Sequence, residues 1–385
     1  DRRDEPFSRA PAASAPRRSV RRTRLGGHLL GDLGEQPRPL GEAAAEGGDE
    51  GVAQRGGDLL ALVAHITRPG QGQAALAQQA RGHHARRAVV VCRREGHLAM
   101  QMTAEFMAGM CFTFQARWDE ATAHFRAAIA LYPRVGDLPV LQTAYENLAY
   151  VLLYRGDHDL ALAEAAHALA LAGRAGDIRG QCNSGCHVAL ASLRLGDLVR
   201  ARRVVAEAAA LLGVLEDHVL RCIVHTVQGR IERAAGADEA ARLAYVRAVA
   251  IAGEHGLVQE EVVPAYTELL ELYAGLPGAA SETARLLPLA RRLARRFPAH
   301  TGAWLRAEAL LLAQRGRHDA ARRTLARAVH TLRARGMRHE LARTLEVVAS
   351  LAPAGERARA RAEALQIHRE TGAQADLRRV EAMPR

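Results

Sequence analysis

The sequence predicts an all-α protein in which antiparallel helix pairs stack into a solenoid. Two recurrences lead to this prediction: glycine follows a 20-residue series between residues 136 and 336, and a stripe of small and large residues recurs every 40 residues. A third observation agrees, because only 4% of the 385 residues are aromatic. Sheets favour aromatic and β-branched residues, whereas alanine-rich segments suit close contacts between helices.

Glycine and aspartate mark the ends of the predicted helices. Members of the glycine series stand at Gly136, Gly156, Gly176, Gly196, Gly236, Gly256, Gly316 and Gly336. Glycine readily adopts the left-handed conformation that ends a helix. The first four are followed by Asp137, Asp157, Asp177 and Asp197. Aspartate there can cap the next helix by accepting a hydrogen bond from a free N–H group. Each 20-residue interval therefore holds one helix of roughly 15 residues and a turn.

The stripe is first seen in the segment 116–133, ARWDEATAHFRAAIALYP. The stripe and its four later copies are Ala121, Phe125, Ala128; Ala161, Ala165, Ala168; Ala201, Val205, Ala208; Ala241, Tyr245, Ala248; and Ala321, Leu325, Ala328. The preceding helix of each unit carries a small residue at its matching position, namely Gly109, Ala149, Ala189, Gly229 and Ala309. Small residues let the two helices of a unit approach closely. With a degenerate unit near residue 276 and a last one over about 341–370, we expect about seven repeats.

These residues resemble the tetratricopeptide repeat (TPR), whose signature is small residues and an aromatic on two antiparallel helices. That repeat has about 34 residues and this one has 40, which overlaps the HEAT range, so a HEAT array is the alternative fold. The resemblance implies a right-handed solenoid whose concave side binds partners. Longer repeats with an ending such as ARAEALQIHRETGAQADLRRVEAM are similar to the C-terminal arrays of large bacterial signalling and transcriptional regulators. This similarity to regulator arrays implies a non-catalytic scaffold or sensor module that binds a protein or peptide.

Two regions of different composition divide the chain. Residues 1–95 are rich in Arg, Ala, Gly and Pro without a sustained period, so we expect this segment to be disordered or to lie outside the true domain. Its basic cluster between Arg17 and Arg24 suggests either an arm for nucleic acid or a flexible tail, and we favour the tail. Residues 97–382 form the predicted repeat domain.

The first helix of each unit supplies the candidate binding groove. Counting along these helices predicts groove positions at Phe106, Met107, Met110, Phe114, Asn147, Tyr150, Tyr154, Asn183, His187, Arg194, Arg230 and Arg233. The groove would run from an aromatic and methionine end to a basic end. This suits an extended or helical peptide with apolar anchors and an acidic flank. Alternatively, the Phe and Met side chains cap an exposed first repeat.

A basic surface is the second candidate site. Residues 285–338 contain 14 arginines against Glu308 and Asp319. The patch is predicted at Arg291, Arg292, Arg295, Arg296, Arg322, Arg323 and Arg327. It could bind nucleic acid, which makes a nucleic-acid-associated protein the alternative function, or an acidic protein surface. The other interpretation is a solvated helix face, which we favour.

The residue types exclude several chemistries. All 53 basic residues are arginine, so a lysine-bearing phosphate loop, the usual kinase lysine and a lysine Schiff base are impossible. The 17 histidines show no pairing with a nucleophile or carboxylate, and no catalytic motif appears, so we expect a non-enzyme without a cofactor. Cys182, Cys186 and His187 lack a second ligand pair, so we expect buried thiols and no metal site.

The chain also shows no membrane signal. No apolar run approaches the ~18 residues of a membrane span, and no signal peptide opens the sequence, so we expect no membrane partner. Five scattered cysteines fit reduced thiols in a cytoplasm.

Overall fold

The structure, a computed structural model, describes residues 76–382, and this part of the chain is helical without a strand. None of its helices has the length and apolarity that a membrane crossing needs. The helices follow in this order: α2 (Leu76–Arg94), α3 (Leu98–Phe114), α4 (Trp118–Val135), α5 (Leu138–Arg155), α6 (His158–Ala175), α7 (Ile178–Arg194), α8 (Leu198–Leu211), α9 (His218–Ala234), α10 (Asp238–Glu254), η1 (Glu260–Val262), α11 (Val263–Tyr273), α12 (Ala280–Arg296), η2 (Pro298–His300), α13 (Thr301–Gln314), α14 (His318–Ala334), α15 (Arg338–Leu351), α16 (Ala354–Glu370) and α17 (Gln374–Glu381).

Helices α3 to α16 form seven antiparallel pairs, so the predicted solenoid of about seven repeats is confirmed. The 40-residue phase runs through the array, since first helices begin at Leu98, Leu138, Ile178 and His218 and again at Arg338. The degenerate unit is also a helix pair, α11 and α12. In the fifth and sixth repeats a short 3-10 helix precedes the first α-helix.

The glycine series ends helices as predicted. All eight glycines have a positive φ, from 60° at Gly256 to 89° at Gly156. Asp137, Asp177 and Asp197 cap the next helix by accepting a hydrogen bond from the N–H three residues on. Asp157 differs, because its carboxylate pairs with the Arg155 guanidinium at 2.9 Å and makes no cap hydrogen bond.

The predicted stripe is the contact between the two helices of a repeat. Every stripe residue is buried, with at most 4% of its surface exposed. Where the second helix carries an aromatic ring, as at Phe125 and Tyr245, the first helix carries glycine. A Cβ on Gly109 would stand 2.6 Å from Phe125, and one on Gly229 would stand 2.4 Å from Tyr245. The size of one residue therefore fixes the size of its partner.

The array begins earlier than the sequence suggested. Residues 76–94 form α2, which packs on α3 and buries Ala85, Ala88 and Cys92 completely. The prediction of disorder over 1–95 is wrong for this segment, because its apolar residues, although few, are spaced to face α3. The rest of that prediction, with the basic cluster, falls on residues 1–75, outside the described residues.

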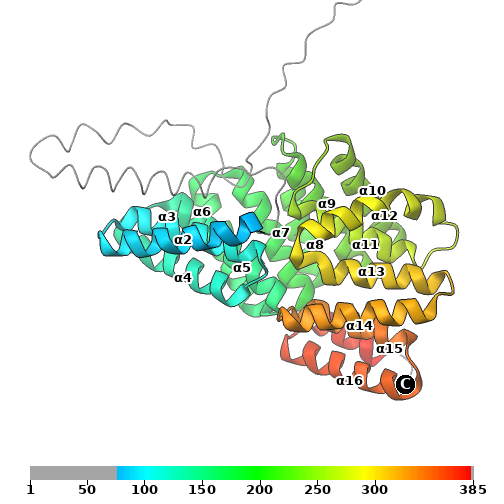
Figure 1. The fold of residues 1–385 in the computed structure, drawn as a ribbon. Helices are drawn as coiled ribbons and strands as arrows, with labels where there is room; N and C mark the ends of the chain where they lie inside the picture. Colours follow the sequence, from blue (N-terminus) through cyan, green and yellow to red (C-terminus); the bar gives the residue numbers. More distant parts are fainter. Residues whose placement is uncertain (1–75, 383–385) are drawn as a thin grey trace, which may run out of the picture.

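The superhelix turns far enough for its ends to meet. Helix α5 contacts α15 and α7 contacts α17, so the second and third repeats touch the C-terminal helices. Figure 1 shows the same path, with the orange and red helices returning below the green ones. Core residues of the first two repeats and of the last two join in one buried cluster, which includes Leu141 and Leu341. The first helices therefore enclose a space.

Candidate functional site

The enclosed space is a cavity of about 140 Å³ lined mainly by the first helices of the repeats. Its wall comes from α3, α5, α7, α9 and α15, closed by residues of η1, α11 and η2. Most of the predicted groove residues line it, namely Met110, Phe114, Asn147, Tyr150, Tyr154, Asn183, His187, Arg194 and Arg230. The stacking of repeats thus brings together residues that are up to 120 positions apart in the sequence.

Phe106, Met107 and Arg233 are not in the cavity wall. Phe106 faces the second helix of its own repeat, where its ring lies 5.9 Å from that of Phe125, and only 4% of it is exposed. Met107 packs at the edge of the same core cluster. Because α2 covers α3, these side chains do not cap an exposed repeat end, and that alternative interpretation is wrong.

An aromatic cluster forms one side of the cavity. The rings of Tyr150 and Tyr154 lie 4.8 Å apart, and Tyr154 stacks on Trp118 at 5.3 Å. The Tyr150 hydroxyl donates a hydrogen bond of 3.0 Å to Glu260, which lies 110 residues later in η1. His300 of η2 approaches the same carboxylate, with Nε2 at 3.3 Å from Oε1. These contacts lie in the cavity wall and link the second repeat to the fifth and sixth.

Amides and a carboxylate form the next part of the wall. Glu146 of α5 accepts hydrogen bonds from the Asn183 amide at 2.6 Å and the Ser184 hydroxyl at 3.3 Å, both on α7. Burial raises the pKa of Glu146 to about 7, although these hydrogen bonds lower it in part. The Asn147 amide donates to the Thr143 carbonyl oxygen within its own helix.

The predicted basic end is not basic. Buried Glu268 accepts hydrogen bonds from Arg230 at 3.0 Å, from Arg233 at 3.2 Å and from Arg343 at 3.0 Å. Arg306, only 1% exposed, pairs with Glu271 on one side and with Glu340 on the other. The cavity wall also includes Glu260, Glu261 and Glu340. Carboxylates on neighbouring first helices therefore neutralise the arginines that were expected to meet an acidic ligand.

Arg194 is the exception among the arginines of the wall. Its guanidinium lines the cavity and makes no hydrogen bond or ion pair with another described residue. Burial lowers its pKa to about 10, and Asp376 opposes this shift. A partly buried cation that no carboxylate contacts directly is costly, and a bound anion would relieve that cost.

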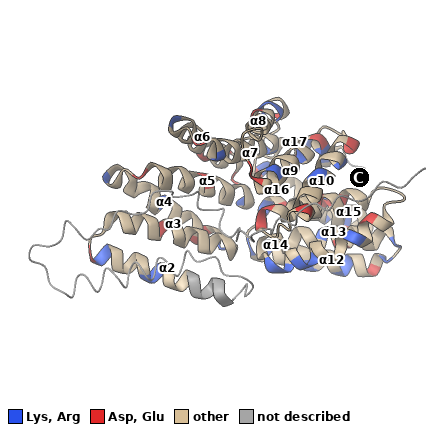
Figure 2. Ribbon diagram, turned by 90° about the horizontal axis from the view of Figure 1, so that it is seen from above, with Lys and Arg blue, Asp and Glu red and all other residues tan. Residues whose placement is uncertain are grey.

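The arginines of the predicted basic patch lie on α12 and α14, two helices with blue segments in Figure 2, and all but the half-buried Arg296 are exposed. Arg291 lies 3.6 Å from Glu308, Arg322 pairs with Asp319, and Arg296 covers the ring of Phe297. Arg292, Arg295, Arg323 and Arg327 make no ion pair with a described residue. Since Arg306 of the same segment is buried, the surface is less basic than the residue count suggests.

The cysteines behave as the sequence predicts. Cys182 and Cys186 are free and buried in α7. Cys182 and Cys222 occupy equivalent places in successive repeats, and each thiol donates to a carbonyl oxygen 26 residues on, at 3.5 and 3.3 Å. Both residues thus fill the contact between the two helices of a repeat.

Three solved structures resemble the chain over most of its length. A Rap protein complexed with competence and sporulation factor aligns with a TM-score of 0.62 at 14% identity, over 84% of this chain and 99% of that one. NprR in complex with its cognate peptide NprX gives 0.62 at 13%, over 84% and 90%. The Rap conjugation gene regulator of plasmid pLS20, in complex with the Phr* peptide, gives 0.61 at 15%, over 85% and 88%. The chain is a TPR-like repeat protein.

The array is TPR-like rather than the alternative HEAT array, because the structural neighbours are TPR-like helical solenoids. No protein-family model and no curated protein sequence matches the chain. At these identities the likeness concerns the fold of the TPR-like array alone.

Proposed function

We propose that this protein is a non-catalytic sensor module of a bacterial signalling or transcriptional regulator, acting in the cytoplasm, and that it binds a peptide or a protein segment in the central cavity. The observation that carries the proposal is Arg194, a guanidinium that lines the cavity beside tyrosines and amides and makes no hydrogen bond or ion pair with another described residue. Two of the complexes of similar fold contain a peptide, NprX or Phr*, which supports this class of ligand.

The wall suggests the chemistry of the ligand. Arg194 would bind a carboxylate, either a side chain or a peptide C-terminus. Met110, Phe114 and Leu153 offer an apolar surface for one anchoring side chain. Because other arginines of the first helices are neutralised by carboxylates, we propose one acidic group in the ligand rather than an acidic stretch.

The size of the cavity indicates how the ligand enters. Its 140 Å³ is below the roughly 300–1,000 Å³ of sites for drug-sized ligands. A peptide would therefore insert one or two side chains, or widen the superhelix at the contacts that close it. The hydrogen bond between Tyr150 and Glu260 joins the second repeat to the fifth in the cavity wall, so a widening would break it. Ligand binding would thus change the shape of the whole array, as a sensor requires.

A peptide screen tests the proposal. Synthetic random heptapeptides, with free or amidated C-termini, are screened on the immobilised chain, and selected peptides are measured by fluorescence anisotropy. We expect Arg194→Gln to weaken binding at least tenfold while the helical circular dichroism is unchanged. The matched control is Arg126→Gln on α4, where the arginine is exposed and outside the cavity. Equal binding by wild type and Arg194→Gln, or no selected peptide, would contradict the proposal.

The exposed arginines of α12 and α14 favour the nucleic-acid alternative, since several have no carboxylate partner. Binding of a mixed-sequence DNA or RNA duplex that falls steeply with salt, and is lost when Arg292, Arg323 and Arg327 become glutamine, would support it. Binding that is weak at low salt, or that survives these substitutions, would exclude that surface as the site.

A further inference from the structure

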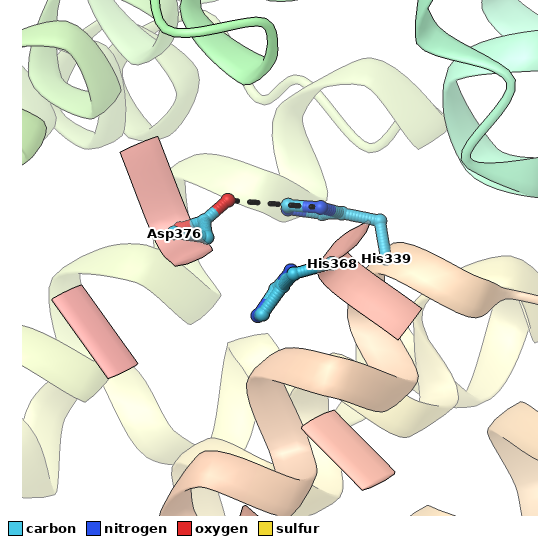
Figure 3. A group of neighbouring side chains, drawn as sticks. All are labelled: His339, His368 and Asp376. Atoms are coloured by element: carbon cyan, nitrogen blue, oxygen red, sulfur yellow. Dashed lines mark ion pairs between the residues drawn. The ribbon is translucent and has the colours of Figure 1, made fainter. Parts of the chain in front are cut away.

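A buried cluster of histidine and aspartate lies where the superhelix closes, and one of its members, His339, also lines the cavity. His339 lies in the first turn of α15, His368 lies near the end of α16, and Asp376 lies in α17 (Figure 3). One nitrogen or oxygen atom from each side chain lies within 4.8 Å of the other two. All three are buried, with exposed fractions of 3%, 0% and 6%.

The imidazoles of this cluster have open nitrogens. Both ring nitrogens of His339 and Nδ1 of His368 are buried without a hydrogen-bond partner. His339 Nδ1 lies 3.9 Å from Asp376 Oδ2, which is too long for a hydrogen bond. A buried polar atom without a partner costs about 1–3 kcal/mol, so three in one place need an explanation. Coordination of a metal ion would supply it.

The second layer of contacts orients these groups. His368 Nε2 lies 2.7 Å from Glu346 Oε1, and a proton on Nε2 leaves the lone pair on Nδ1. Metal-binding histidines commonly have such a carboxylate on the other nitrogen. Arg379 donates to Asp376 Oδ1 at 2.5 Å and to Glu346 Oε2 at 2.5 Å. Asp376 Oδ2 stays available to a metal ion.

The second repeat offers a candidate for a fourth ligand. His158 begins α6, is 1% exposed, and has no hydrogen-bond partner on either ring nitrogen. Its ring lies edge-on to that of His339, with centroids 5.3 Å apart.

We propose that His339, His368 and Asp376 bind a zinc-class transition-metal ion, with His158 as the fourth ligand. Three imidazoles and one carboxylate suit tetrahedral Zn²⁺. Bonds of about 2.1 Å place tetrahedral ligand atoms about 3.4 Å apart, closer than the present spread. The ion would draw α6 of the second repeat toward α15, α16 and α17. It would therefore hold the superhelix closed around the cavity. The sequence predicted no metal site because these residues are separated by up to 218 positions.

The test uses the full chain, without an affinity tag and stripped by a chelator. Zn²⁺ is titrated by calorimetry and Co²⁺ by visible absorption, which is intense when cobalt is tetrahedral. We expect one tightly bound ion per chain and a higher melting temperature with zinc. Binding should be lost in His339→Leu and Asp376→Asn. Glu346→Gln, which leaves all ligands in place, should weaken it about 10–100-fold.

Two further variants make the result decisive. His218 and His255 stack at 3.5 Å elsewhere in the chain, so His255→Leu is the matched control for adventitious binding. It should leave the tight site intact. Absence of tight binding, or binding lost in His255→Leu and kept in His339→Leu, would overturn the proposal. His158→Leu should weaken binding at least tenfold, and unchanged affinity there would remove the tie to the second repeat. If a ligand variant loses its helical circular dichroism, its loss of binding is not informative. The Co²⁺ spectrum of Glu346→Gln, which leaves all ligands in place, then tests the site.

Discussion

Gly109 of α3 lies directly against the ring of Phe125 of α4, so closely that a Cβ on the glycine would stand 2.6 Å from the aromatic carbon Cε1. Phe125 is completely buried. In the sixth repeat the corresponding pair is Ala309 and Leu325, both buried as well. The two pairs fill the same space between the helices in different ways: the large ring of Phe125 faces glycine, and the smaller Leu325 faces alanine.

This relationship predicts a double-mutant cycle. Gly109→Ala should destabilise the protein by about 1–3 kcal/mol through overpacking, although alanine favours the helix by about 1 kcal/mol. Adding Phe125→Leu recreates the alanine–leucine pair of the sixth repeat, so the double variant should be more stable than the sum of the single effects by about 1–2 kcal/mol. Urea unfolding followed by circular dichroism measures each free energy.

The control for Gly109→Ala is Gly173→Ala in α6. Gly173 is in a helix and a Cβ there would meet nothing within 4 Å. This substitution should stabilise the protein by up to about 1 kcal/mol, since it gains helix propensity without a clash. Equal effects at the two positions would contradict the close approach at Phe125.

A second prediction concerns the buried ion network. Arg306 donates to Glu271 Oε1 at 2.9 Å and to Glu340 Oε2 at 2.7 Å. Burial alone would raise the pKa of Glu340, but Arg306 and Arg343 hold it at about 2. Arg306→Met would leave both carboxylates with fewer partners, so the free energy of unfolding should fall by about 3–5 kcal/mol.

Chemical denaturation measures the free energy of unfolding of Arg306→Met, with Arg322→Met as the control variant. Arg322 pairs with Asp319 on the exposed face of α14, so its loss should change stability by less than about 1 kcal/mol. A similarly small effect of Arg306→Met would mean that water replaces the guanidinium and that the network adds little to stability.

Glu146 predicts a dependence of stability on pH. Burial raises the pKa of its carboxyl to about 7, while Asn183 and Arg179 lower it in part. The unfolded carboxyl has a pKa near 4.3. Between these values the folded chain binds more protons than the unfolded chain, so stability falls as the pH rises. The contribution is complete below about pH 4.5 and lost above about pH 7, and amounts to at most about 4 kcal/mol.

The measurement compares wild type with Glu146→Gln from pH 5 to pH 8. Glutamine is neutral throughout, so the stability of the variant relative to wild type should increase with pH over this range. The difference between the two proteins removes the effect of other titrating groups, including Glu261, whose pKa burial also raises to about 7. A difference that stays constant with pH would show that Glu146 is ionised in the folded state.

Local features made most of the repeat predictable. Glycines, capping aspartates and the stripe act within about 20 residues, so their spacing reports the helix ends and the contacts within a pair. The sequence also held a signal for α2 that the prediction did not use. Gly96 belongs to the same 20-residue series and has a φ of 74°, and Ala116 occupies the next position of the series with a φ of 55°.

Contacts between distant repeats could not be predicted in this way. The rotation from each repeat to the next accumulates along the array, and only its sum brings Tyr150 to Glu260 or His158 to His339. The pairing of Arg230 with Glu268 has a range between these two cases, because Glu268 lies 38 residues on, in the first helix of the next repeat. Aligning successive first helices would have revealed that pair.

The closure itself gives the last prediction. Gly156 ends α5 with a φ of 89°, and a Cβ there would stand 2.9 Å from Thr371 and 3.4 Å from Arg338, both in the C-terminal helices. Gly136 ends α4 with a φ of 75°, but a Cβ there would meet nothing within 4 Å. Alanine at either position strains the left-handed backbone by about 1–2 kcal/mol. Gly156→Ala, but not Gly136→Ala, should lower the free energy of unfolding by roughly 1 kcal/mol more, because it also pushes the repeats apart. It should also enlarge the radius of gyration measured by X-ray scattering. Identical stability and size of the two variants would mean that the superhelix is open at this contact in solution.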